Sequence, residues 1–173
     1  MATPTYEPIA TYAVTSPTAS LVFSNIPQSY KHLVIQLNSV RVLLASGNGE
    51  GATALLLNGD SGANYYYIQF TADQNGSLTT AGSYSRIDTM VSSFEDDVTP
   101  SNHDIDIVGY SDSDKHKTVL ISGGIATGNQ YPRTGVHAYR WQNNNPVTSI
   151  TFTSSYTNGR FDVGTRISIF GVH

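Results

Sequence analysis

The chain of 173 residues contains no cysteine, which excludes disulfide bonds, thiolate nucleophiles and zinc sites built from cysteine. It is also poor in charge, because Asp, Glu, Lys and Arg make up only 13% of its residues, against about a quarter in an average soluble protein. The formal net charge is -4, and no segment concentrates Lys and Arg. We therefore expect no nucleic-acid partner, since the attraction that supplies most non-specific affinity for nucleic acid is missing.

Long apolar runs are absent as well. No stretch approaches the roughly 18 consecutive apolar residues of a membrane-spanning helix. Residues 1–5 have neither the basic region nor the apolar core of a secretory signal peptide. The sequence therefore predicts a protein that is made in the cytoplasm and has no membrane partner.

The chain is rich in Ser, Thr, Asn, Gly and Tyr, with β-branched and aromatic residues between turn formers. This composition is typical of strands and predicts almost no helix. Short runs of alternating apolar and polar residues recur about every dozen residues, which favours an antiparallel sandwich or barrel of about eight to eleven strands. The expected strands are residues 6–15, 20–23, 32–41, 52–57, 65–70, 86–92, 104–110, 118–122, 135–141, 148–154 and 165–172. No linker or composition shift divides the chain, so we expect a flexible arm at 1–5 and a single domain at 6–173.

Two local patterns are specific enough to predict side-chain placement. Leu33, Ile35 and Leu37 share one face of their strand, and this face should be buried. The Asn58-Gly59 step suits the positive φ angles of a tight turn, so we expect 52–57 and 65–70 to pair as a hairpin.

Two groups of residues offer chemistry. The stretch 59–62, Gly-Asp-Ser-Gly, is similar to the nucleophile loop of chymotrypsin-like proteases, but no histidine motif of that family accompanies Ser61, and a hairpin turn is the simpler interpretation. Oxygen and imidazole ligands for a divalent ion gather at 103–106 and 112–116, but their spacing fits a solvated acidic hairpin better than a metal site. We therefore expect no catalytic residue, metal or cofactor.

Aromatic residues are the main candidates for binding. Tyr65, Tyr66 and Tyr67 are consecutive, so each face of their strand receives at least one tyrosine. Trp141 precedes a polar run at 142–145, at the end of an expected strand. These four residues are candidate contacts for a partner protein or for a stacked sugar ring, with packing in the core as the alternative.

Over residues 6–172 the chain resembles small virion proteins of tailed phages of environmental bacteria, including marine phages and cyanophages. The likeness lies in strand and turn motifs at 6–11, 23–27, 30–35, 57–65, 117–120, 141, 147–151, 161–165 and 170–171. The position of Ser61 is often Thr in that family, and residues 73–100 match no part of it. The resemblance implies a jelly-roll or related sandwich that decorates capsids or belongs to tails.

From this resemblance we expect a non-enzymatic structural protein of a bacteriophage virion. The favoured role is a capsid decoration or cement protein on the capsid surface, made in the host cytoplasm, that binds the major capsid protein as a homo-oligomer, with a trimer favoured. The alternative is a tail-associated or receptor-binding protein that adheres to host glycan. A hydrolase is a third class, which would need His, a carboxylate and Ser, or a metal, to converge in one cleft.

Overall fold

The computed structural model describes residues 5–43, 50–73, 75–94, 100–125, 132–156 and 158–173. These residues are all-β, with fourteen strands and no helix, and their ladders are antiparallel. No helix in this part of the chain is therefore long and apolar enough to cross a membrane.

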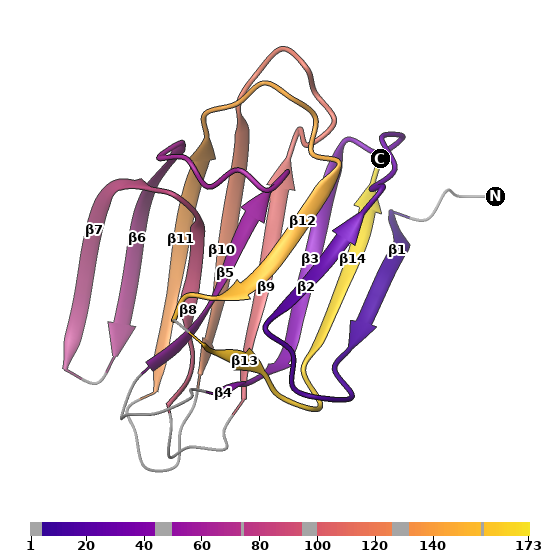
Figure 1. The fold of residues 1–173 in the computed structure, drawn as a ribbon. Helices are drawn as coiled ribbons and strands as arrows, with labels where there is room; N and C mark the ends of the chain where they lie inside the picture. The colour runs from indigo at the N-terminus through magenta and orange to yellow at the C-terminus, as the bar shows by residue number, and fades with distance from the viewer. Residues whose placement is uncertain (1–4, 44–49, 74, 95–99, 126–131, 157) are drawn as a thin grey trace.

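Two large sheets pack face to face as a single domain (Figure 1). In order across the first sheet lie β1 (Tyr6–Ala13), β14 (Arg166–Val172), β3 (His32–Val40), β9 (Ser101–Val108), β10 (Lys117–Ile125), β11 (Arg133–Trp141), β6 (Tyr65–Asp73) and β7 (Gly76–Tyr84). The second sheet contains β2 (Ser20–Ser24), β12 (Ser149–Ser154), β5 (Glu50–Leu57) and β8 (Ile87–Phe94). A small third sheet pairs β13 (Arg160–Phe161) with β4 (Val42–Leu43).

The strand order is that of a jelly roll with two added hairpins. The jelly roll consists of β1-β14-β3-β9 in one layer and β2-β12-β5-β8 in the other, so the first strand lies beside the last. The β6–β7 hairpin is inserted between β5 and β8, and the β10–β11 hairpin is inserted between β9 and β12. The expected antiparallel, jelly-roll-like sandwich is confirmed.

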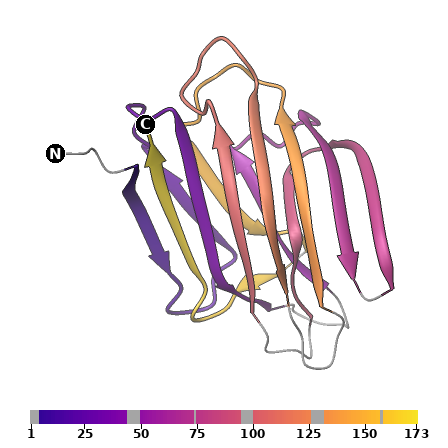
Figure 2. The same cartoon turned by 180° about the vertical axis from the view of Figure 1, so that it is seen from behind.

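Both insertions extend the same layer beyond β9, so the first sheet is much wider than the second. β8 packs across the sandwich against β9, β10 and β11. The outermost strands, β6 and β7, continue past it (Figures 1 and 2). One end of the larger sheet therefore has an inner face that the smaller sheet does not fully cover.

The core lies between the two jelly-roll layers and follows the period of the strands. Leu33, Ile35 and Leu37 are fully buried, which confirms the prediction for this face of β3. Across the core, Ile150 and Phe152 of β12 are equally buried. Each such side chain contributes about 1.5–3 kcal/mol by leaving water, and together they hold the frame on which the uncovered end is built.

One local prediction is wrong. Asn58 and Gly59 do adopt positive φ angles of 53° and 69°, but β5 and β6 do not pair as a hairpin, because they belong to different sheets. The Asn58 side chain instead donates to the carbonyl of Pro146 and accepts from the backbone N–H groups of Thr148 and Ser149. The turn is thus fixed to the chain entering β12, and residues 61–64 carry the chain across the sandwich.

The eleven expected strands are present, with shifted ends, and three further strands join them: β4, β7 and β13. The first four residues of the expected N-terminal arm lie outside the described residues, so the arm at 1–5 stays a prediction.

Candidate functional site

The uncovered end of the larger sheet forms one side of a cleft of about 740 Å³. Its floor comes from the inner face of β6, β7 and β11, and its wall from β8 and the loop after β12. Most of the residues that line it are polar, and they include Gln69, Thr71, Asp73, Tyr84, Arg86, Asp88, Arg133, His137 and Tyr156. A concave surface on which polar groups from distant segments converge is the default candidate for a binding site.

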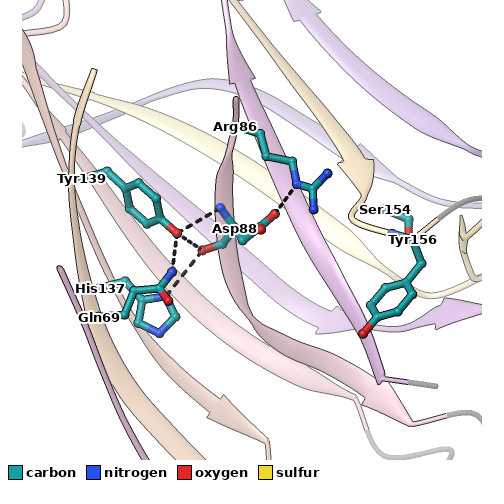
Figure 3. A network of polar contacts seen from close by, with 7 residues as sticks. All are labelled: Gln69, Arg86, Asp88, His137, Tyr139, Ser154 and Tyr156. Atoms are coloured by element: carbon teal, nitrogen blue, oxygen red, sulfur yellow. Dashed lines mark hydrogen bonds and ion pairs between the residues drawn. The ribbon is translucent and has the colours of Figure 1, made fainter. Parts of the chain in front are cut away.

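A closed hydrogen-bond network holds the floor of this cleft (Figure 3). The Tyr139 hydroxyl donates to the backbone carbonyl of Asp88 at 3.0 Å and accepts from the Asp88 backbone N–H at 3.2 Å. It also accepts from the side-chain amide of Gln69. His137 contacts the Asp88 carbonyl through Nδ1 at 3.4 Å and Thr71 Oγ1 through Nε2 at 3.3 Å. The network joins β8 of one sheet to β6 and β11 of the other, so it fastens the two sheets together at the floor of the cleft.

The pKa values of two titratable groups at the floor, Tyr139 and His137, are shifted in the direction that favours the neutral form. Burial raises the pKa of the Tyr139 phenol well above its ordinary value, and the nearby charge of Asp88 acts in the same direction. Burial lowers the pKa of His137, against the opposing effect of its contact with the Asp88 carbonyl. The floor thus presents fixed, uncharged hydrogen-bonding groups.

The charged residues of the cleft are arranged in two ion pairs. Arg86 Nε lies 2.7 Å from Asp88 Oδ1, and Arg133 Nε lies 3.8 Å from Asp73 Oδ2. Since each cation faces an anion, the cleft has no strong net field of either sign. It suits a neutral polar ligand better than a phosphate or a metal cation.

Tyrosine rings line the rim. Tyr84 is 43% exposed and stacks on Tyr67, with ring centroids 4.8 Å apart and planes 16° apart. Tyr67 in turn packs against Tyr139 at 5.7 Å, which ties the rim to the floor. Tyr156 is 46% exposed, and its backbone N–H donates to Ser154 Oγ at 3.0 Å. The rim therefore offers exposed aromatic area, and at Tyr84 the ring is held in place by stacking on Tyr67.

Two of the four aromatic candidates from the sequence are core residues. Tyr65 and Trp141 are fully buried and stack on each other with centroids 6.4 Å apart. Neither ring is accessible to a partner protein or a sugar, which corrects the expectation for both. They are buried because the 61–64 segment and the Asp60 turn close over that end of the sandwich, where Trp141 Nε1 donates to Asp60 Oδ2 at 2.7 Å.

Tyr66 and Tyr67 lie on opposite faces of β6, as their alternation predicts. Tyr66 is 42% exposed on the outer face, with the Arg140 guanidinium 5.2 Å from its ring centroid. Tyr67 is partly buried on the inner face beside the cleft. These are the two sequence candidates that remain near an accessible surface.

The protease-like stretch at 59–62 has a structural role. Asp60 Oδ1 accepts from the Gly62 N–H at 2.9 Å and from the Asn64 amide at 3.2 Å, while Ser61 is exposed. Burial alone would raise the pKa of Asp60, but the hydrogen bonds from Trp141, Gly62 and Asn64 outweigh it, and the pKa is lowered. In this stretch it is therefore Asp60, and not Ser61, whose side chain holds the local structure together.

The oxygen and imidazole groups considered as metal ligands do not converge. Asp104 and Asp106 point to the outer face of β9, whereas His103 points into the core. Near 112–116, Asp112 faces Lys115 at 3.3 Å. Among the described residues, no three His, Cys, Asp or Glu side chains lie close enough to hold a metal ion.

Because His103 is buried, we expect the folded protein to lose stability in acid. Its Nε2 lies 3.0 Å from Ser101 Oγ, while its Nδ1 is buried without a hydrogen-bond partner. Burial lowers the pKa of His103 to about 4, against about 6.5 in an unfolded chain. The unfolded state therefore binds more protons between these values, and stability is lost as the pH falls from about 6.5 to 4, by about 3 kcal/mol in total.

Urea unfolding at several pH values checks this prediction. The wild-type chain should lose stability through that window, and H103L should lose distinctly less. Equal slopes for the two proteins would mean that other groups account for the acid sensitivity.

A second accessible surface lies on the outer face of the larger sheet. Four large apolar side chains from the extension are exposed there, namely Ile68, Phe70, Leu120 and Val136, at 62, 47, 41 and 47%. They are neighbours, because Phe70 pairs with Val136 while Ile68 and Leu120 both pair with Ala138. We refer to Ile68, Phe70, Leu120 and Val136 as the outer apolar band.

Sequence reasoning missed the residues of the cleft. Arg86 and Asp88 alternate around Ile87, a pattern that places both on one face of a strand and could have marked them as a pair. Tyr84, His137 and Tyr156 have no shared spacing, because they come from three separate segments. No sequence signal joins them.

No protein-family model, no curated protein and no solved structure matches the chain. The resemblance to phage virion proteins therefore stays a prediction from the sequence motifs.

Proposed function

We propose that the chain is a non-enzymatic structural protein of a bacteriophage virion, which binds the major capsid protein as a decoration or cement protein on the capsid surface. The observation that carries the proposal is the outer apolar band, which exposes four large apolar side chains on a firmly held sheet. Clustered exposed apolar groups on a soluble domain mark a protein contact surface. The strand and turn motifs shared with virion proteins supply the context.

The jelly-roll frame fits this role. A surface on extended strands is stiff, so little conformational entropy is lost when it docks against a shell. A homo-oligomer would engage several equivalent sites of the symmetric capsid at once, and this multivalency would strengthen attachment without new contacts in each copy. Binding across neighbouring capsid subunits would then stabilise the particle by added buried area.

Co-sedimentation with capsids that lack the protein tests this proposal. The wild-type chain should bind in a fixed ratio and raise the resistance of the particles to heat. The double variant I68S/F70S should bind at least about ten-fold more weakly, because losing two buried apolar side chains costs more than about 1.4 kcal/mol.

V22S is the matched control, since Val22 is 60% exposed on β2 of the other sheet and its loss should leave binding unchanged. Capsid binding that is indifferent to I68S/F70S would contradict docking through the outer apolar band.

The cleft favours a second candidate, a tail-associated or receptor-binding protein that adheres to host glycan. Fixed neutral hydrogen-bonding groups on the floor and the exposed rings of Tyr84 and Tyr156 at the rim are the features on which sugars stack and bind. In the same co-sedimentation, recovery with purified tails but not with capsids would favour this candidate.

A further inference from the structure

β7 is an unusual edge strand. It lies at the extreme edge of the larger sheet in both views, and within the part of the chain that the structure describes β6 is its only ladder partner (Figures 1 and 2). Of its nine residues, Thr80 is partly buried and the other eight are exposed. Leu78 alone exposes 65% of its surface. The outward backbone N–H and C=O groups of such a strand form a ready template for another strand.

The other edges of the two large sheets are protected against pairing, and β7 is not. β1 carries Glu7 and Pro8, and its register shifts between Pro8 and Ala10. β2 has only five residues, and β8 pairs with β5 through two register shifts. Charge, proline, short length and bulges are the devices by which proteins block edge pairing. The stretch 76–84 has no charged residue and no proline, and its register with β6 is unbroken.

We propose that β7 pairs with β7 of a second copy of the chain, antiparallel and across a two-fold axis centred on Thr80. The two larger sheets then join into one continuous sheet. This inference depends on the edge strand alone and goes beyond the proposed role in the virion.

The register centred on Thr80 aligns all nine residues and is sterically self-complementary. On the inner face, it places Leu78 opposite the partner's Gly82 and Tyr84 opposite the partner's Gly76, so each large side chain faces a glycine. Thr80 faces the partner's Thr80, a cross-strand pair that is favourable in antiparallel sheets. A shift of the axis by one residue would shorten the ladder and lose both matches.

The same register covers the exposed Leu78. The ring of Tyr67 extends over Gly82, at 3.2–3.3 Å from where a Cβ would lie there. The partner's Leu78, opposite Gly82, would therefore approach the Tyr67 ring. A side chain that is 65% exposed in the single chain would gain an apolar contact.

Pairing through β7 would also change the cleft. Gly76, Leu78 and Tyr84 of β7 line it, so the partner's β7 would continue the floor beyond its present edge. The two clefts would open into one groove that runs across the two-fold axis. A long ligand could then contact both copies, with each copy completing the site of the other.

An antiparallel pair of identical strands has two-fold symmetry. This surface therefore predicts a dimer, in contrast to the trimer that the sequence resemblance favours. The molecular mass of the purified protein in solution distinguishes a dimer from a trimer directly.

The absence of native cysteine allows a register-specific test on the full chain. Under mild oxidation, T80C should form a covalent dimer, because the two residues at position 80 lie opposite each other. L78C should not cross-link to itself, since its equivalent in the partner lies roughly 13 Å further along the strand. Equal cross-linking of the two variants, or none of T80C, would overturn the register.

Sedimentation equilibrium over a range of concentrations tests the assembly itself. The wild-type chain should be a dimer, and T80K and T80E should each dissociate at least ten-fold more readily because like charges face each other at the axis. An equimolar mixture of the two should restore the dimer. T118K, which adds the same charge to the exposed face of β10 away from the edge, is the control. A monomer, a trimer or a dimer indifferent to T80K would overturn the proposal.

Discussion

Replacing Lys117 with Met is expected to lower the free energy of unfolding by about 3–5 kcal/mol. Lys117 is fully buried although it carries a charge. Its Nζ donates to the carbonyls of Asp112 and Lys115 at 2.7 Å each, and to that of Asn144 at 3.1 Å. It therefore fastens the turn between β9 and β10 to the loop between β11 and β12.

The size of the effect follows from what the substitution leaves behind. A hydrogen bond to a charged group contributes about 1.5–3 kcal/mol, and the carbonyls that lose their donor add a desolvation cost. Met is unbranched and of similar length, so little cavity forms. The decrease in the free energy of unfolding therefore measures the contribution of the polar contacts. Burial lowers the pKa of Lys117, against the opposing charges of Asp112 and Asp114. The three carbonyls compensate for this burial.

Urea denaturation followed by circular dichroism measures the change. K115M is the matched control, because Lys115 is 63% exposed and its ion pair with Asp112 is worth less than about 1 kcal/mol. Equal stability of K117M and K115M would mean that water replaces the ammonium group and that Lys117 does not anchor the loops.

Replacing Trp141 with Ala is expected to cost about 3–5 kcal/mol, the range for removing a large aromatic side chain from a core. Trp141 is fully buried at the end of β11, where it stacks on Tyr65 and donates to Asp60. The substitution opens a cavity and removes one of the hydrogen bonds that stabilise the Asp60 carboxylate. The turn at 58–62 and the segment that crosses between the sheets should loosen together.

W141F separates the ring from its N–H group and should cost less, because most of the ring volume remains. S61A is the control in the same turn, since Ser61 is exposed and its change should stay within about 0.5 kcal/mol. Thermal and urea unfolding of the three variants give the comparison. A W141A protein as stable as the wild type would contradict the core assignment.

Strand period was enough to predict most of the frame. Leu33, Ile35 and Leu37 are buried as their alternation requires. In β9, Ile105 and Ile107 face the core and alternate with Asp104 and Asp106, which face outward. This works because a half-buried strand must show its period in the sequence, whichever strand lies beside it.

Pairing partners could not be derived in the same way. Asn58 and Gly59 have the backbone geometry that their residue types favour, but geometry at a turn does not decide which strand follows in the ladder. That choice depends on Pro146, Thr148 and Ser149, which lie 88 to 91 positions further along the chain. Non-local contacts of this kind leave no local sequence signal.

The cleft and β7 escaped prediction for a related reason. Eight of the nine residues of β7 are exposed, and they lie on both faces of the strand. Gly76–Tyr84 therefore shows no apolar period. The burial of Trp141 also depends on the distant Asp60 turn, so residue type alone could not distinguish a core aromatic from a stacking platform. A binding surface assembled from several distant segments becomes visible only when the fold brings them together.

The position of β14 has a consequence for how the protein is made. β14 lies between β1 and β3, and it pairs with both along nearly its whole length. Until the ribosome has added β14, this gap in the sheet stays open, and the rows of N–H and C=O groups on either side have no partner. Non-local closure of this kind is slow, with times from milliseconds to seconds. The domain can therefore complete its fold only after synthesis has passed residue 172, so any chain released before that point would carry an open sheet.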